Sequence, residues 1–156
     1  MGTTKVMVPT GDLDVYVEKK LDFSAKDFLF NKDDRGVLTF GGSKGSFSPA
    51  AYVAWRGDDF AVGSYSIAPV GEGDAIAWYN HASLNSWPAI SGTFNIHAIS
   101  LGDNPSIDFD FNFIAKNRWG NREEIHVSGR GVINGFDSKV VSPSDKDSPA
   151  GDELWR

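Results

Sequence analysis

A histidine and an aspartate in the second half of the chain offer the clearest route to acid–base chemistry. Matching the apolar pattern around Phe94 to that around Phe113 in an antiparallel pair sets His97 opposite Asp110. Cross-strand neighbours lie about 4.5–5.5 Å apart at Cβ, so this register predicts a direct contact. A carboxylate beside an imidazole fixes the tautomer of the ring and supports proton transfer.

The following strand extends this polar face. Matching Phe111 to Val127 sets Asn112 opposite His126 and Asp108 opposite Arg130. The face then collects seven polar side chains: His97, Asp108, Asp110, Asn112, His126, Ser128 and Arg130.

Two interpretations of this face stay open. If it lines the interior of a small barrel, the catalytic candidates are His97, Asp110, His126 and Arg130, with the guanidinium neutralising an enolate or a carboxylate of a small apolar ligand. If it is the wetted side of an antiparallel sheet, paired polar residues of this kind are ordinary.

A cationic loop between two predicted strands is the main candidate for binding. The segment Lys116-Asn117-Arg118-Trp119-Gly120-Asn121-Arg122 places three cations around one tryptophan in an otherwise acidic chain. Trp119 can stack on a sugar or a base while Lys116, Arg118 and Arg122 hold a phosphate, a carboxylate or an acidic neighbour. The alternative is a hairpin tip whose cations balance nearby acids.

A second binding candidate is Trp78-Tyr79-Asn80-His81, which brings two rings, an amide and an imidazole together. Sugar pockets are furnished in this way, so Trp78, Tyr79 and His81 are candidate ligand contacts. Buried aromatic side chains also dominate small β cores, and a core role is the alternative for the rings.

Metal and cofactor motifs are not recognisable. The recurring aspartate pairs do not continue into a calcium loop, and the three histidines lack zinc-binding spacing. The chain shows no nucleophile elbow, phosphate-binding loop or dinucleotide-binding glycine pattern. We therefore expect neither a metal nor a cofactor.

The elements that must position these residues are strands. Ile107, Phe109, Phe111 and Phe113 alternate with polar residues, and a period of two is the period of a strand. Similar alternation at Leu13 and elsewhere predicts further strands, and the three near 93–100, 107–115 and 124–133 form an apparent meander. The predicted fold is an all-β antiparallel sandwich or small barrel.

Three local features complete this prediction. A hairpin is expected around the loop 31–36, and another between 51–55 and 60–67, turning at 57–59. One short helix is expected at about 74–84, because Asp74 can cap it and an incomplete apolar stripe follows.

The chain divides into one β domain and a tail. Residues 1–136 are expected to form a single domain, whereas 137–156 are rich in Ser, Pro, Asp and Lys. We expect this polar tail to dock through Leu154 and Trp155, on the same chain or on a neighbouring copy.

Composition limits the partners. The 156 residues include no cysteine and carry a formal net charge of −6. The charge opposes general nucleic-acid binding, and neither a membrane span nor a signal peptide is recognisable. A cytoplasmic or virion location and a homo-oligomer are expected.

Three functions remain under consideration. A non-catalytic recognition module would bind a glycan or a protein partner through aromatic and charged loops. A structural or assembly protein, such as a virion component, would use the tail and the cationic loop. A small-molecule-binding β-barrel enzyme of the cyclase or isomerase type would use the His–Asp face, so whether the chain is an enzyme stays open.

Overall fold

The strand predicted from the alternating phenylalanines is present and lies at the centre of the fold. Ile107, Phe109, Phe111 and Phe113 are each at most 1 % exposed, while the polar residues between them lie on the opposite side. The structure is a computed structural model, and it describes residues 8–45, 49–82, 85–118 and 123–136.

The described residues form ten strands, all paired in antiparallel fashion. Hydrogen bonding links nine of them in the order β2-β1-β10-β9-β8-β7-β5-β4-β3, and β6 pairs with β8. The all-β prediction is confirmed. In chain order the strands are β1 (Thr10–Val17), β2 (Lys20–Ser24), β3 (Asp27–Lys32), β4 (Val37–Ser43), β5 (Ala50–Arg56), β6 (Gly63–Ile67), β7 (Ala75–Ala82), β8 (Asn85–Ser100), β9 (Ser106–Lys116) and β10 (Glu124–Asn134).

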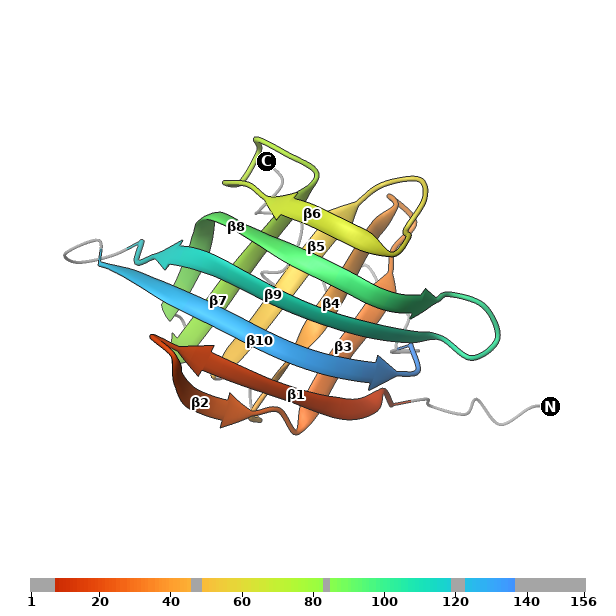
Figure 1. Cartoon of the computed structure of the whole chain (residues 1–156), viewed down its shortest axis with the longest axis horizontal. Helices are drawn as coiled ribbons and strands as arrows, with labels where there is room; N and C mark the ends of the chain where they lie inside the picture. The colour runs from red at the N-terminus through yellow and green to blue at the C-terminus, as the bar shows by residue number, and fades with distance from the viewer. Residues whose placement is uncertain (1–7, 46–48, 83–84, 119–122, 137–156) are drawn as a thin grey trace.

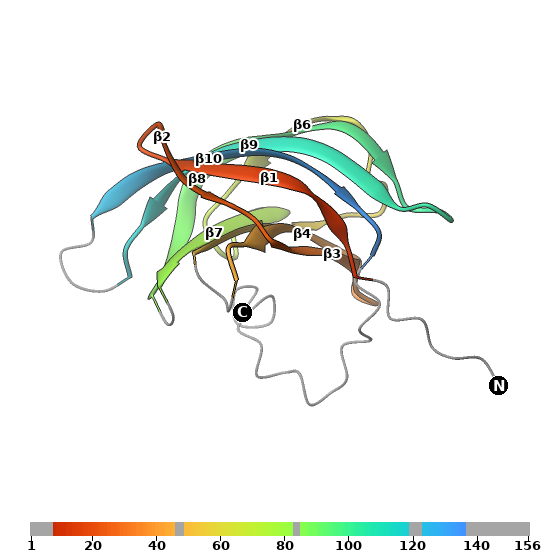
Figure 2. The same cartoon turned by 90° about the horizontal axis from the view of Figure 1, so that it is seen from below.

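The sheet curls into a half-barrel with two layers (Figures 1 and 2). We call the layer of β2, β1, β10, β9, the second half of β8 and β6 sheet A, and the layer of the first half of β8, β7, β5, β4 and β3 sheet B. Figure 2 shows sheet A arching over sheet B. This arrangement agrees with the predicted sandwich or small barrel.

Two connections hold the layers together at opposite sides. On one side, β8 runs through both sheets. On the other side, the chain turns sharply between β2 and β3, where Ala25 N donates a hydrogen bond to Leu13 O (2.8 Å) and Lys26 N donates one to Ser43 O (2.9 Å). This corner links β1 in sheet A to β4 in sheet B.

The core between the layers is aromatic, and glycines make room for it. Phe111 faces Gly129 of β10 in the ladder, and a Cβ at Gly129 would lie 2.6 Å from the Phe111 ring. On the other neighbour, a Cβ at Gly92 would lie 2.5 Å from Phe113 Cβ. Real Cβ atoms do not approach so closely, so Gly129 makes room for the Phe111 ring and Gly92 allows the close approach of the β9 backbone at Phe113.

The helix predicted at about 74–84 is wrong. Most of this range forms the strand β7 instead. Ala75, Ala77 and Tyr79 face the core, while Ile76 and Trp78 face the other side. Because both faces of β7 are buried, the apolar residues form a continuous run, which periodicity alone does not distinguish from a helical stripe.

Of the two predicted hairpins, one is present and one is not. The predicted turn at 31–36 joins β3 to β4, which pair as expected. The hairpin predicted between 51–55 and 60–67 is wrong, since β5 pairs with β4 and β7 whereas β6 pairs with β8 in the other layer. The meander of β8, β9 and β10 is confirmed.

We predict that Phe111→Ala lowers the free energy of unfolding by about 3–5 kcal/mol, because the substitution leaves a cavity in a close-packed core. Asn112→Ala, one residue away on the outer face, is the matched control and should change stability by less than about 0.5 kcal/mol. Urea unfolding followed by fluorescence measures both. A loss below about 1 kcal/mol for Phe111→Ala would contradict the assigned core.

Candidate functional site

The polar face of β9 lies on the outside of sheet A. Its side chains point away from the buried phenylalanines, and those of His97 and Asp110 are 42 % and 28 % exposed. The catalytic interpretation required these side chains to line the interior of a barrel. The His97 and Asp110 side chains face solvent instead.

His97 and Asp110 are nevertheless in contact, as the sequence predicted. The His97 Nε2 to Asp110 Oδ2 distance is 2.6 Å. The predicted register was wrong by two residues, because Asn95 and not His97 stands directly opposite Asp110. A bulge between Ile96 and Ala98 places His97 beside the same carboxylate.

This carboxylate is part of a short polar network. Asn95 Nδ2 donates a hydrogen bond to Asp110 Oδ1 (2.8 Å), and the Ser64 hydroxyl donates to Asn95 Oδ1. The network joins β6, β8 and β9 on the outer surface. Both carboxylate oxygens of Asp110 already contact protein groups, since Oδ1 accepts a hydrogen bond from Asn95 and Oδ2 contacts His97.

The remaining catalytic candidates do not join His97. The register between β9 and β10 also differs by two residues, so Arg130 faces Asp110 and His126 faces Ile114. An Arg130 Nη2 to Asp108 Oδ1 distance of 3.9 Å is an ion pair but too long for a hydrogen bond. The structure therefore assembles the pair His97–Asp110, not the full predicted set.

The second binding candidate is divided between two faces of β7. Trp78 lies on the outer face of sheet B, where it is 5 % exposed, and Tyr79 lies in the core at 1 %. The Tyr79 hydroxyl donates to Asp22 Oδ2 (2.6 Å) and lies 3.4 Å from His81 Nδ1. Burial, together with Asp22, raises the pKa of Tyr79 well above its usual value. These rings do not offer a stacking surface for a sugar.

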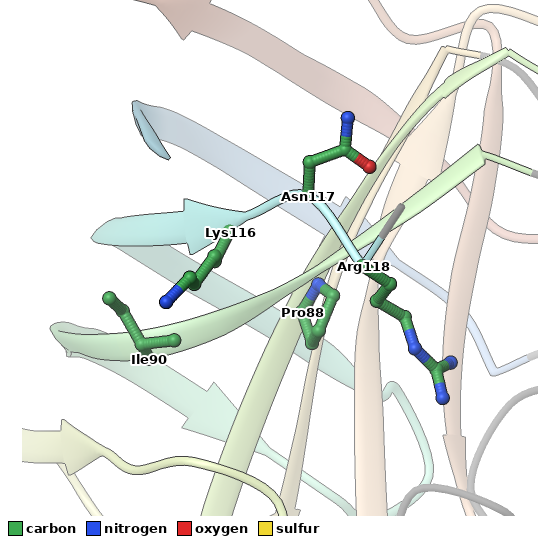
Figure 3. A pocket seen from close by; sticks show the side chains of 5 residues that line it. All are labelled: Pro88, Ile90, Lys116, Asn117 and Arg118. Carbon is green, nitrogen blue, oxygen red and sulfur yellow. The ribbon is translucent and has the colours of Figure 1, made fainter. Parts of the chain in front are cut away.

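The cationic loop borders a surface groove at the bend of β8. The groove has a volume of about 330 Å³ and is lined by Pro88, Ile90, Lys116, Asn117 and Arg118. Figure 3 shows Lys116 extending over β8 toward Ile90, while Arg118 extends on the other side of Pro88, away from Lys116. Two cationic side chains thus flank an apolar pair in one groove.

The bend at this apolar pair has a local cause. β8 pairs with β7 as far as Pro88 and with β9 from Ala89, and the register slips between Ala89 and Ser91. Proline cannot donate a ladder hydrogen bond, and a bulge at Ile90 turns the strand. Pro88 and Ile90 lie at this change of sheet, and both line the groove.

The loop itself is described in part. Lys116 ends β9 opposite Glu124, and Asn117 N donates to Glu123 O (2.9 Å), which continues the hairpin beyond the ladder. Trp119 and Arg122, two of the predicted binding residues, lie outside the described residues.

Sequence reasoning found the cations of this groove but missed its apolar pair. Pro88 and Ile90 lie far from Lys116 in the sequence. The available signal was a proline followed by an apolar pattern that continued into the predicted strand at 93–100.

A second groove lies at the opposite end of β9. Its volume is about 480 Å³ and it is lined by Val8, Thr10, Asp103, Asn104, Pro105, Ser106, Asn134 and Gly135. Neither groove is lined by His97, Asp110, His126 or Arg130.

Other site types were sought over the same residues. Across the described ranges, His, Asp and Glu nowhere gather in a group of three or more that suits a metal ion. Nor does the described part of the chain contain a helix with the length and apolar character needed to span a membrane.

Comparison of the chain with protein-family models, curated proteins and solved structures found no match.

We predict that Tyr79 contributes to stability in a pH-dependent way. Its pKa is raised on folding, so the contribution is fully present below pH 10, the ordinary value, and is lost as the pH rises above it. Tyr79→Phe should cost about 0.5–1.5 kcal/mol near neutral pH through the lost hydrogen bond, and should flatten the alkaline fall in unfolding free energy.

Urea unfolding between pH 7 and pH 11 measures this effect, with Tyr16→Phe as the control because Tyr16 is 37 % exposed. Parallel alkaline curves for the wild type and Tyr79→Phe would show that the buried phenol is not the group that titrates.

Proposed function

We propose that this chain is a non-catalytic recognition module that binds an acidic segment of a protein partner. The site is the groove at the bend of β8, with Lys116 and Arg118 receiving carboxylates. Pro88 and Ile90 receive an apolar side chain between them.

The observation that supports this proposal is the combination of cations with an apolar pair in an acidic chain. The net charge is −6, yet Lys116 and Arg118 line one groove. Screening limits the field of distant surface charges to about 8–10 Å at physiological salt, so the local field is set by Lys116, Arg118 and their neighbours, among which Glu124 lies opposite Lys116 in the ladder. Apolar area that a partner can desolvate, with charged groups beside it, is a common arrangement of an interface hot spot.

A protein partner is favoured over a glycan by the positions of the aromatic rings. Sugar binding relies on exposed rings, whereas the tryptophans in the described part of the chain, Trp55, Trp78 and Trp87, are at most 8 % exposed. Proline and isoleucine suit an aliphatic side chain better than a sugar face. A glycan is therefore the alternative outcome of the test.

Recognition is favoured over catalysis by the position of the acid–base pair. His97 and Asp110 lie on an outer sheet face, and both oxygens of Asp110 already contact protein groups. Enzymes work in concave sites that exclude water, and the enzyme alternative required an enclosed face.

We predict that Lys116→Glu combined with Arg118→Glu weakens binding of an alternating Glu-Leu peptide by about tenfold or more, or roughly 1.4 kcal/mol. Wild-type binding should weaken as salt rises, because charge pairs at an interface are screened. Fluorescence anisotropy with labelled peptide measures both effects. The melting temperature should hardly change, since the groove residues lie at the surface.

Lys26→Glu is the control for a charge reversal away from the groove, because Lys26 is an exposed lysine at the corner between β2 and β3. It makes one of the two charge reversals of the double variant and should retain at least half of the affinity. An alternating Lys-Leu peptide should not bind.

Equal affinities for the wild type and the double variant would exclude the groove as the binding surface. Failure of all acidic peptides, together with retention on an array of sialylated and sulfated glycans, would assign the groove to a sugar instead.

A further inference from the structure

The outer face of sheet B differs in kind from the outer face of sheet A. On β4, β5 and β7 it presents an apolar cluster, which we call the outer cluster: Val37, Ala54, Ile76 and Trp78, each at most 5 % exposed. These side chains lie on the opposite side of the strands from the main core. Strands buried on both faces need a layer of chain on each side.

The described part of the chain supplies few apolar side chains to that second layer. The partly buried apolar residues that it packs against the outer cluster are Tyr52 and Val70. Tyr52 belongs to the sheet itself, where its ring lies 5.4 Å from that of Trp78, and Val70 comes from the connection between β6 and β7. Burial raises the pKa of Tyr52, which agrees with a covered face.

A polar atom on the same face also lacks a partner. The buried Oδ1 of Asn80 accepts no hydrogen bond from the residues that the structure describes. Asn80 follows Ile76 and Trp78 on the outward side of β7, so a backbone amide of a covering segment is the donor that it lacks.

The chain leaves the described fold beside this sheet. The ring of Phe136 lies 4.7 Å from that of Phe30 on β3, the edge strand of sheet B, on the core side of that strand, so the chain leaves the fold at an edge that gives access to the outer face. Neighbouring strands are about 4.8 Å apart, so β7 lies roughly 14 Å across the sheet from β3. Twenty residues follow Phe136 and span up to about 66 Å when extended.

The composition of this segment suits the task. Large apolar side chains occur at two places in residues 137–156, Val140-Val141 and Leu154-Trp155. The other ranges outside the description are 1–7, 46–48, 83–84 and 119–122, and the three internal ones have two to four residues. Residues 1–7 contain Val6 and Met7 but no aromatic ring.

We propose that residues 137–156 fold back across the outer face of sheet B and cover the outer cluster, with Leu154 and Trp155 as the apolar contacts. The segment then forms a third layer over β4, β5 and β7. It protects an apolar face that would otherwise bind other chains. The occupant is the tail of the same chain, and this proposal is independent of the groove at β8.

The absence of cysteine in the chain allows a direct test with single introduced thiols. Ala54→Cys places a thiol in the outer cluster, and its reaction with a maleimide reports whether the face is covered. In the full chain the thiol should react slowly. Deletion of 137–156 should accelerate the reaction at least tenfold, because the covering layer is removed.

Three controls calibrate this measurement. Ser128→Cys on the outer face of sheet A should react quickly in both chains, and Ala51→Cys in the main core should react slowly in both. Deletion of 1–7 should leave the reactivity of Ala54→Cys unchanged. Should the deletion of 137–156 prevent folding, the full-length variant Leu154→Ser/Trp155→Ser replaces it and should give the same acceleration.

Several results would overturn the proposal. Rapid reaction of Ala54→Cys in the full chain would show an open face. Slow reaction after deletion of 137–156, with a dimer in sedimentation, would assign the cover to a second copy. Acceleration on deletion of 1–7 alone would assign it to the N-terminal segment.

Discussion

The change of partner along β8 is the constraint on which both layers depend. Its first residues pair with β7 in sheet B, and from Ala89 onward it pairs with β9 in sheet A. For β8 to belong to both sheets, its hydrogen-bond ladder has to change partner where the two sheets diverge. Pro88, which lacks an amide hydrogen, and the bulge at Ile90 interrupt the ladder there. The half-barrel and the groove therefore have one origin.

The filling of the space between the layers follows from a pairing of large and small residues. Phe111 faces Gly129 and Phe113 faces Gly92 across the ladders, so the rings of β9 occupy volume that side chains on the neighbouring strands would take. The rings of Phe40 and Phe109, one from each layer, meet at 4.7 Å in an edge-on arrangement. Aromatic contacts of this kind join the two sheets across the core.

Sequence reasoning succeeded where one face of a strand is wet and failed where both are buried. The alternation in 107–113 predicted β9 and its core face, because polar residues mark the outer side. In β7 the outer residues are Ile76 and Trp78, and their apolar character removed the alternation that identifies a strand. The contact of His97 with Asp110 was predicted from a register two residues away from the true one, and the bulge restored it. The apolar pair of the groove needed the bend of β8, which depends on long-range pairing that no local pattern shows.

The bend also places apolar residues at the surface without weakening the core. Residues within a flat sheet face either the core or the outer surface. An apolar side chain on the outer surface is exposed to water unless another layer buries it, and on sheet B the outer cluster is buried. At a bulge the strand leaves both patterns, and Ile90 lies half-buried beside Pro88 rather than in either layer. The exposed apolar area of Ile90 is therefore separate from the apolar area buried between the sheets. The neighbouring hairpin adds two cations at its exposed end, so the proposed site lies where β8 departs from regular pairing to change sheets.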